Sequence, residues 1–167
     1  DTNEDANEDT NEDANEDDTD TSLVNSATTL AGITFTTPGA ITFGNAGTDQ
    51  LTLSTGAVTI DATGIITAEA LIDSTANENL TLQSDTSVAL TYGVGQTKEL
   101  GELYVSTPIT NVYANITTTQ NQRFNHTGDY DLDNTGTFNT KADITLSGKQ
   151  IFLNQKVSRT APNDLTL

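Results

Sequence analysis

The acidic side chains that could do chemistry are concentrated in one short stretch, DYDLD, where Asp129, Asp131 and Asp133 alternate with Tyr130 and Leu132. Because side chains alternate along a β-strand, the three carboxylates would share one face, roughly 7 Å apart. Carboxylate oxygens are the ligands that Ca²⁺ prefers, so these residues form a candidate Ca²⁺ site. The other interpretation is a solvated outer face, with Tyr130 and Leu132 in the core.

Catalysis has little support elsewhere in the chain. Arg123 precedes the same carboxylates, which would suit a site that cleaves polysaccharides, because such sites pair carboxylates with a cation. His126 is the only histidine and there is no cysteine, so imidazole or thiolate metal sites and most acid–base pairs are unavailable. We therefore expect a protein that is not an enzyme and requires no cofactor, with Ca²⁺ as the one candidate ion.

Three Asn-x-Thr sequences are candidate N-glycosylation sites, at Asn79, Asn115 and Asn125. Some sequons arise by chance in a chain this rich in Asn and Thr. In an elongated β fold, those that face outward would be accessible.

The elements that would position these residues follow from one repeated pattern: a polar or small residue, an apolar residue, Thr, and an apolar residue. Clear copies are QLTL at 50–53, NLTL at 79–82, DITL at 143–146 and DLTL at 164–167, and looser copies begin at residues 32, 40, 57 and 89. In a strand the apolar residues of each copy face one side and the Thr faces the other. Short strands with closely and regularly spaced turns predict an all-β fold, a β-solenoid of roughly seven short coils. The alternative is a β-sandwich, which also has many short strands.

Composition divides the chain into two regions. Residues 1–21 form a low-complexity tail built on an Asn-Glu-Asp-x repeat, in which more than half of the side chains are acidic and none is basic. Such a tail predicts a solvated spacer. The alternative is a Ca²⁺-tuned spacer, because carboxylate and amide oxygens suit that ion. Residues 22–167 form a Thr-rich β domain, and Thr accounts for 33 of the 167 residues of the chain.

The net charge of −18 limits the possible partners. Nucleic acid is excluded as an expected partner, because six Lys and Arg residues against 24 Asp and Glu residues could not replace phosphate counterions. The same charge argues against anionic membrane surfaces. No apolar run approaches the ~20 residues of a membrane-spanning helix, so we expect no membrane insertion.

Residues 99–148 carry a resemblance to a known family. The pieces are Leu103-Tyr104-Val105, then ITTTQNQRFN at 116–125, then ITLSG at 144–148. This order of motifs resembles the β-helical repeats of filamentous-haemagglutinin-like adhesins and other large secreted bacterial surface proteins, and residues 30–98 match it more loosely. The resemblance implies an extracellular, elongated, non-enzymatic protein.

The final strand motif ends on Leu167 with no polar cap after it, and Leu23-Val24 follows the acidic tail. We expect Leu23, Val24, Leu165 and Leu167 to form assembly joints, because a solenoid end must stack on another coil. The expected function is a structural segment or self-assembling subunit of a secreted cell-surface filament or adhesin stalk. Its partners would be copies of itself or adjoining coils of a longer chain. The alternatives are a β-helix module that binds or cleaves carbohydrate, with surface glycans as partners, and the Ca²⁺-tuned spacer.

Overall fold

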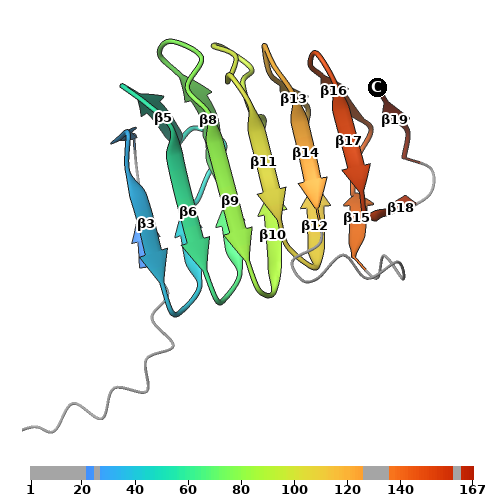
Figure 1. Ribbon diagram of the computed structural model, residues 1–167, viewed down its shortest axis with the longest axis horizontal. Helices are drawn as coiled ribbons and strands as arrows, with labels where there is room; N and C mark the ends of the chain where they lie inside the picture. The colour runs from blue at the N-terminus through green and yellow to red at the C-terminus, as the bar shows by residue number, and fades with distance from the viewer. Residues whose placement is uncertain (1–21, 25–26, 126–135, 160–162) are drawn as a thin grey trace, which may run out of the picture.

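The protein is an all-β parallel solenoid of about six turns. The computed structural model describes residues 22–24, 27–125, 136–159 and 163–167, and this part of the chain contains no helix. It therefore has no helix long and apolar enough to cross a membrane. The strands lie side by side in a row along the long axis, in chain order from one end to the other (Figure 1). The acidic tail expected over 1–21 lies outside the described residues.

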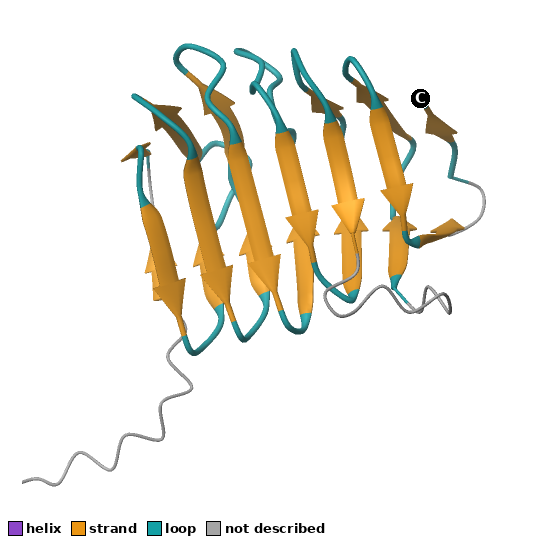
Figure 2. Cartoon of the chain, viewed as in Figure 1, coloured by secondary structure: helices purple, strands orange, loops and turns teal. Residues whose placement is uncertain are grey.

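Most turns contribute one strand to each of three faces, and Figure 2 shows that strands joined by short loops make up nearly all of the body. Face A is the sheet β1 (Ser22–Val24), β4 (Ile41–Phe43), β7 (Ile66–Ala68), β10 (Ser87–Leu90), β12 (Ile109–Val112), β15 (Thr137–Thr140) and β18 (Lys156–Arg159). Face B contains β2 (Thr28–Ala31), β5 (Gln50–Ser54), β8 (Leu71–Ser74), β13 (Ile116–Thr117), β16 (Ile144–Ser147) and β19 (Leu165–Thr166). Face C is β3 (Thr34–Thr37), β6 (Val58–Ala62), β9 (Leu80–Ser84), β11 (Leu103–Ser106), β14 (Gln122–Asn125) and β17 (Ile151–Asn154).

Face B is continuous although its strands form two hydrogen-bonded groups. Parallel bridges from Ile72 to Val94 and from Val94 to Ile116 join β8 to β13. All the pairings among the described strands are parallel, which rules out a β-sandwich built from antiparallel sheets. The predicted solenoid is thus confirmed.

The solenoid has fewer coils than the sequence suggested, because the turns differ in length. Leu103 pairs with Gln122 in the next coil, whereas Ile116 pairs with Leu146, which lies much further along the chain. The longer coil contains residues that a repeat of constant length would have placed in an additional coil. The regular spacing of the strand motifs therefore predicted roughly seven coils in place of about six.

The core consists of apolar columns that run along the axis. Ile60, Leu82, Val105 and Phe124 pair in register on face C, and each is at most 1% exposed. From face A, the ring of Phe138 meets that of Phe124 edge-on, with centroids 4.8 Å apart. Burial of such side chains contributes roughly 1.5–3 kcal/mol each. Stacking similar short strands thus builds a thin core whose length grows with the number of coils.

The expected alternation holds in most copies of the strand pattern. In β5, Leu51 and Leu53 are buried and Thr52 between them is partly exposed. The copy at 89–92 is an exception. Leu90 is buried, but β10 ends there, and Tyr92 lies outside the strand with 36% of its surface exposed.

Candidate functional site: the two ends of the solenoid

The N-terminal end is formed by β1, β2 and β3, each the outermost strand of its sheet. Two of the predicted assembly residues lie here, because Leu23 pairs with Thr42 and Val24 with Phe43 in the ladder between β1 and β4. Leu30 and Phe35, on β2 and β3, are only partly buried although they pack against the core. Among the described residues, the outer edges of these strands have no pairing strand.

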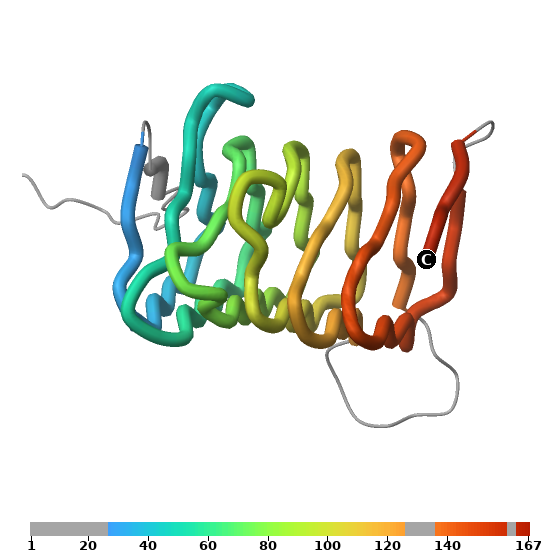
Figure 3. The backbone as a smooth tube through the Cα atoms, turned by 90° about the horizontal axis from the view of Figure 1, so that it is seen from above, coloured from blue at the N-terminus to red at the C-terminus, as the bar shows by residue number. Residues whose placement is uncertain are grey.

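The C-terminal end is formed by β17, β18 and β19, again the outermost strands of their sheets. Figure 3 shows the coils as a row of loops, with the chain's C-terminus at one end of the row. Ile151, Leu153 and Leu165 are half-buried and pack against the core from one side. Leu167 is 71% exposed. The structure thus places all four predicted assembly residues at the two ends.

The edge strand β18 differs from its neighbours in carrying charge. Val157 pairs with Phe138 and Arg159 with Thr140, so both continue inward-facing columns, yet all four residues of β18 are exposed. Arg159 lies 3.9 Å from Asp164, and both side chains are mostly exposed. Charges on an edge strand disfavour pairing with a like-charged edge.

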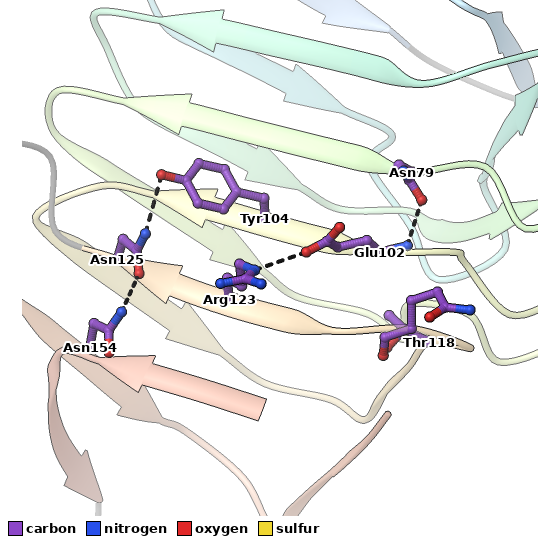
Figure 4. Close-up of polar contacts among 8 residues, drawn as sticks. Asn79, Glu102, Tyr104, Thr118, Arg123, Asn125 and Asn154 are labelled. Atoms are coloured by element: carbon purple, nitrogen blue, oxygen red, sulfur yellow. Dashed lines mark hydrogen bonds and ion pairs between the residues drawn. The ribbon is translucent and has the colours of Figure 1, made fainter. Parts of the chain in front are cut away.

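Face C carries a chain of polar contacts that ties successive coils together (Figure 4). Asn154 donates from Nδ2 to Oδ1 of Asn125 (2.8 Å), and Asn125 donates from Nδ2 to the hydroxyl of Tyr104 (3.2 Å). Arg123, which pairs in register with Tyr104, donates from Nε to Oε1 of Glu102 at 2.9 Å. Its guanidinium lies 4.5 Å from the centre of the Phe152 ring. Asn154 is exposed and the other side chains of this set are partly exposed.

The three glycosylation candidates are not equivalent. Asn79 and Asn115 are exposed at corners, where their Oδ1 atoms accept from the backbone N–H groups of Glu102 and Thr145, both at 2.8 Å. The described side-chain hydrogen bonds of both residues use Oδ1 and not Nδ2. Asn125 is half-buried and uses both its oxygen and its nitrogen in the Asn154–Tyr104 chain.

Two buried glutamines bridge coils, and neither was predicted from the sequence. Gln122 donates from Nε2 to the carbonyls of Ser147 (2.9 Å) and Ile116 (3.2 Å). Gln155 donates to the carbonyl of Thr107 at 2.6 Å. Gln122 lies two residues before Phe124 in the same strand, so both side chains face inward. The inward position of Gln122 could therefore have been predicted from the sequence.

Two buried carboxylates hold the corner between faces B and C. Asp73 accepts from the backbone N–H groups of Thr97 and Lys98 at 3.0 and 3.2 Å. Glu78 accepts from Ala76 N–H at 2.8 Å and from Thr75 N–H at 2.9 Å. The bond from Ala76 is the main cause that lowers the pKa of Glu78 to about 2, and burial opposes it. Both acids therefore serve as acceptors for loop backbone.

The candidate Ca²⁺ ligands Asp129, Asp131 and Asp133 lie outside the described residues, as does His126. In the described ranges, no group of three or more His, Asp or Glu side chains is placed to hold a metal ion.

Comparisons with known proteins add no family. No protein-family model matches the chain, and neither a curated protein nor a solved structure matches it.

Proposed function

We propose that this chain is a non-enzymatic structural protein, a β-solenoid segment or self-assembling subunit of an extracellular cell-surface filament or adhesin stalk. The proposal is based on the strands and apolar side chains at the two ends of the solenoid. Each presents three outermost parallel strands, with apolar side chains that pack against the core and that the described residues bury only in part. A further coil, from the same chain or a second copy, would pair with these edges and cover those side chains.

The energetics favour a joint that uses all three faces. Apolar burial contributes roughly 25 cal/mol per Å², and each ladder hydrogen bond adds about 1 kcal/mol net. Association itself costs an estimated ~4–15 kcal/mol, so one pair of short strands would not hold two copies together. Three edges that meet at once supply several ladder bonds together with the burial of Ile151, Leu153 and Leu165.

The extracellular location rests on the resemblance of residues 99–148 to secreted surface repeats. Nothing in the fold itself specifies a compartment. We therefore propose secretion as part of the same function.

Negative-stain electron microscopy of the purified chain tests the assembly. We expect filaments whose number increases with protein concentration. Leu153→Asp should raise the concentration needed for assembly at least roughly tenfold, because an unpaired carboxylate would be buried in the joint. Thr81→Asp is the matched control, since Thr81 is partly exposed on β9, an interior strand of face C that pairs with β6 and β11. Circular dichroism of both variants separates loss of assembly from loss of folding. Uniform compact particles at all concentrations would refute the proposal.

A second candidate function, carbohydrate binding, is favoured by one observation. Tyr104, Arg123 and Phe152 pair in register in one partly exposed column of face C. Rings and a guanidinium at strand spacing suit stacking against sugar faces. A glycan-array screen of the wild type and of Tyr104→Ala tests this function, which requires binding that the substitution removes.

A further inference from the structure

The middle of face A carries no charge on its strands. β4, β7, β10, β12 and β15 contain no Asp, Glu, Lys or Arg, although the net charge of the chain is −18. Their outward-facing side chains pair in register from coil to coil and are partly exposed: Thr42, Thr67, Ala89, Asn111 and Asn139. Face A thus presents an uncharged strip along most of the solenoid.

Exposed apolar side chains line both borders of this strip. Among the described residues, seven large apolar side chains are exposed, and three of them lie at the ends of the solenoid. The other four all lie along face A. Ile65 and Ile109 lie where the chain enters β7 and β12, and Tyr92 and Tyr113 lie just beyond β10 and β12. Exposed apolar side chains that gather on one surface mark an interaction site.

The tyrosine border also carries two opposite charges. Backbone bonds from Thr91 to Ala68, from Tyr113 to Leu90 and from Lys141 to Val112 continue the parallel register beyond the strands. They place four residues in one row, one from each coil: Glu69, Thr91, Tyr113 and Lys141. Neither of the two charged side chains belongs to an ion pair among the described residues. A row with opposite charges at its two ends is complementary to its own reverse.

We propose that two copies of this chain associate side by side through face A, with their solenoid axes antiparallel. The two-fold axis runs along the strand direction and passes between β10 and β12. Glu69 of each copy then lies opposite Lys141 of the other, and Ile109 and Tyr113 lie beside their own counterparts. A contact of this kind is isologous, and the two sheets pack with their strands aligned. The inference goes beyond the proposed function, which concerns the two ends.

The charges favour a second copy in this orientation. Like net charge makes two copies repel, and they approach most easily through a surface whose strands carry no charge. A rotation about the solenoid axis would instead place the Glu69 border against the Ile65 border, and would leave Glu69 and Lys141 without opposite charges. The antiparallel arrangement therefore satisfies both charged side chains, and it does so twice in each pair of copies.

The size of the strip predicts a weak contact between single chains. Four strands at ~4.8 Å spacing, each crossed over five residues of ~3.3 Å, cover on the order of 300 Å² per copy. Stable interfaces bury about 800 Å² per partner, so this pair should form only at high protein concentration. Copies joined end to end would present the strip repeatedly, which raises the effective concentration and holds filaments side by side.

The first test is sedimentation equilibrium of the full chain with Leu153→Asp, which blocks the end joint and leaves face A unchanged. We expect a reversible monomer–dimer equilibrium. In that background, Ile109→Asp should weaken the dimer at least roughly tenfold, because a carboxylate would be buried next to its own counterpart. Thr81→Asp on face C is the matched control and should leave the dimer unchanged. Circular dichroism shows whether each variant is folded.

The second test reverses the two charges. Glu69→Lys and Lys141→Glu should each weaken the dimer several-fold, because each places like charges opposite one another, and the double reversal should restore it. Lys141 is exposed and Glu69 partly exposed, so these changes leave the core intact. Single reversals without effect, or a double reversal that fails to restore the dimer, would overturn the proposed arrangement.

The results also separate this inference from the proposed function. If the end-blocked chain stays monomeric at every concentration and wild-type filaments remain single in negative stain, the side-by-side contact is wrong while the proposed function stands. If the dimer forms and responds as expected but the wild type makes no filaments, the proposed function fails and the contact through face A stands. If copies do not associate but Ile109→Asp removes binding on a glycan array, face A binds carbohydrate and the inference is wrong.

Discussion

Gln155 reaches along the axis of the solenoid to Thr107, 48 positions earlier in the chain, and donates from Nε2 to its backbone carbonyl at 2.6 Å. Gln155 is 3% exposed. It also lies 3.4 Å from the carbonyl of Asn125, the last described residue before the segment 126–135. The Gln155 side-chain amide thus supplies the hydrogen bond to the Thr107 carbonyl that a backbone N–H of the next coil would otherwise supply.

We predict that Gln155→Leu destabilises the fold by about 1–3 kcal/mol, because it leaves the buried carbonyl of Thr107 without this donor. Chemical denaturation of the purified chain measures the change. Gln150→Leu is the control, since Gln150 is exposed in the preceding turn and should change stability by less than about 0.5 kcal/mol. Equal effects of the two substitutions would contradict the bridging role.

Glu78 should make stability depend on pH in the acid range. Its pKa falls from an ordinary value of 4.5 to about 2 in the folded chain. A carboxyl with a lowered folded pKa stabilises the fold above its unfolded pKa, and this contribution is lost as pH falls toward the folded pKa. On the order of 3 kcal/mol should therefore disappear between about pH 4.5 and 2.

Denaturation of wild type and Glu78→Gln across that pH range measures the effect. The difference in unfolding free energy between them should be largest above about pH 5 and should shrink toward pH 2. A difference that stays constant with pH would show that the Glu78 charge does not hold the loop.

The core columns predict unequal losses of stability when two phenylalanines on neighbouring strands are replaced by alanine. Phe124→Ala should cost about 3–5 kcal/mol, because Phe124 is fully buried against Phe138. Phe152→Ala should cost about 1 kcal/mol or less, because that ring is partly exposed and its recorded ring contact is with the Arg123 guanidinium. Thermal unfolding of the two variants compares these costs directly. Similar losses would mean that the inward and outward assignments on face C are wrong.

The repeated strand pattern predicted the fold, because alternation in a strand depends only on local sequence. Leu80 and Leu82 face inward and Thr81 faces outward, as the copy at 79–82 indicated. Tyr92 was assigned inward by the same pattern, but its ring lies against Gly47 from another turn. A β-carbon at Gly47 would be 2.7 Å from that ring. No local rule anticipates such a long-range contact.

The polar sites were less predictable than the core. The inward position of Gln122 follows from alternation, but its carbonyl partners Ser147 and Ile116 depend on how the coils stack. Asp73 is buried because the loop that contains Thr97 and Lys98 donates to it, which nothing adjacent to Asp73 in sequence indicates. Sites that form between coils can thus be predicted only when the register between neighbouring coils is known, and the sequence pattern does not determine that register.

Glycosylation, if the chain is produced in a host that modifies sequons, should be tolerated unequally. A glycan on Asn115 leaves Oδ1 able to accept from Thr145, so we expect little change in stability. A glycan on Asn125 displaces the bond from Nδ2 to Tyr104 and should cost about 1 kcal/mol. Thermal unfolding of chains that retain one sequon each tests this order. A larger loss for Asn115 than for Asn125 would contradict it.

Hydrogen–deuterium exchange across a concentration series tests whether the outermost strands form the joint between copies. We predict that amide protection of β17 and β3 rises with assembly, while that of the interior strand β9 stays unchanged. Assembly without added protection at β17 and β3 would show that these strands do not form the joint.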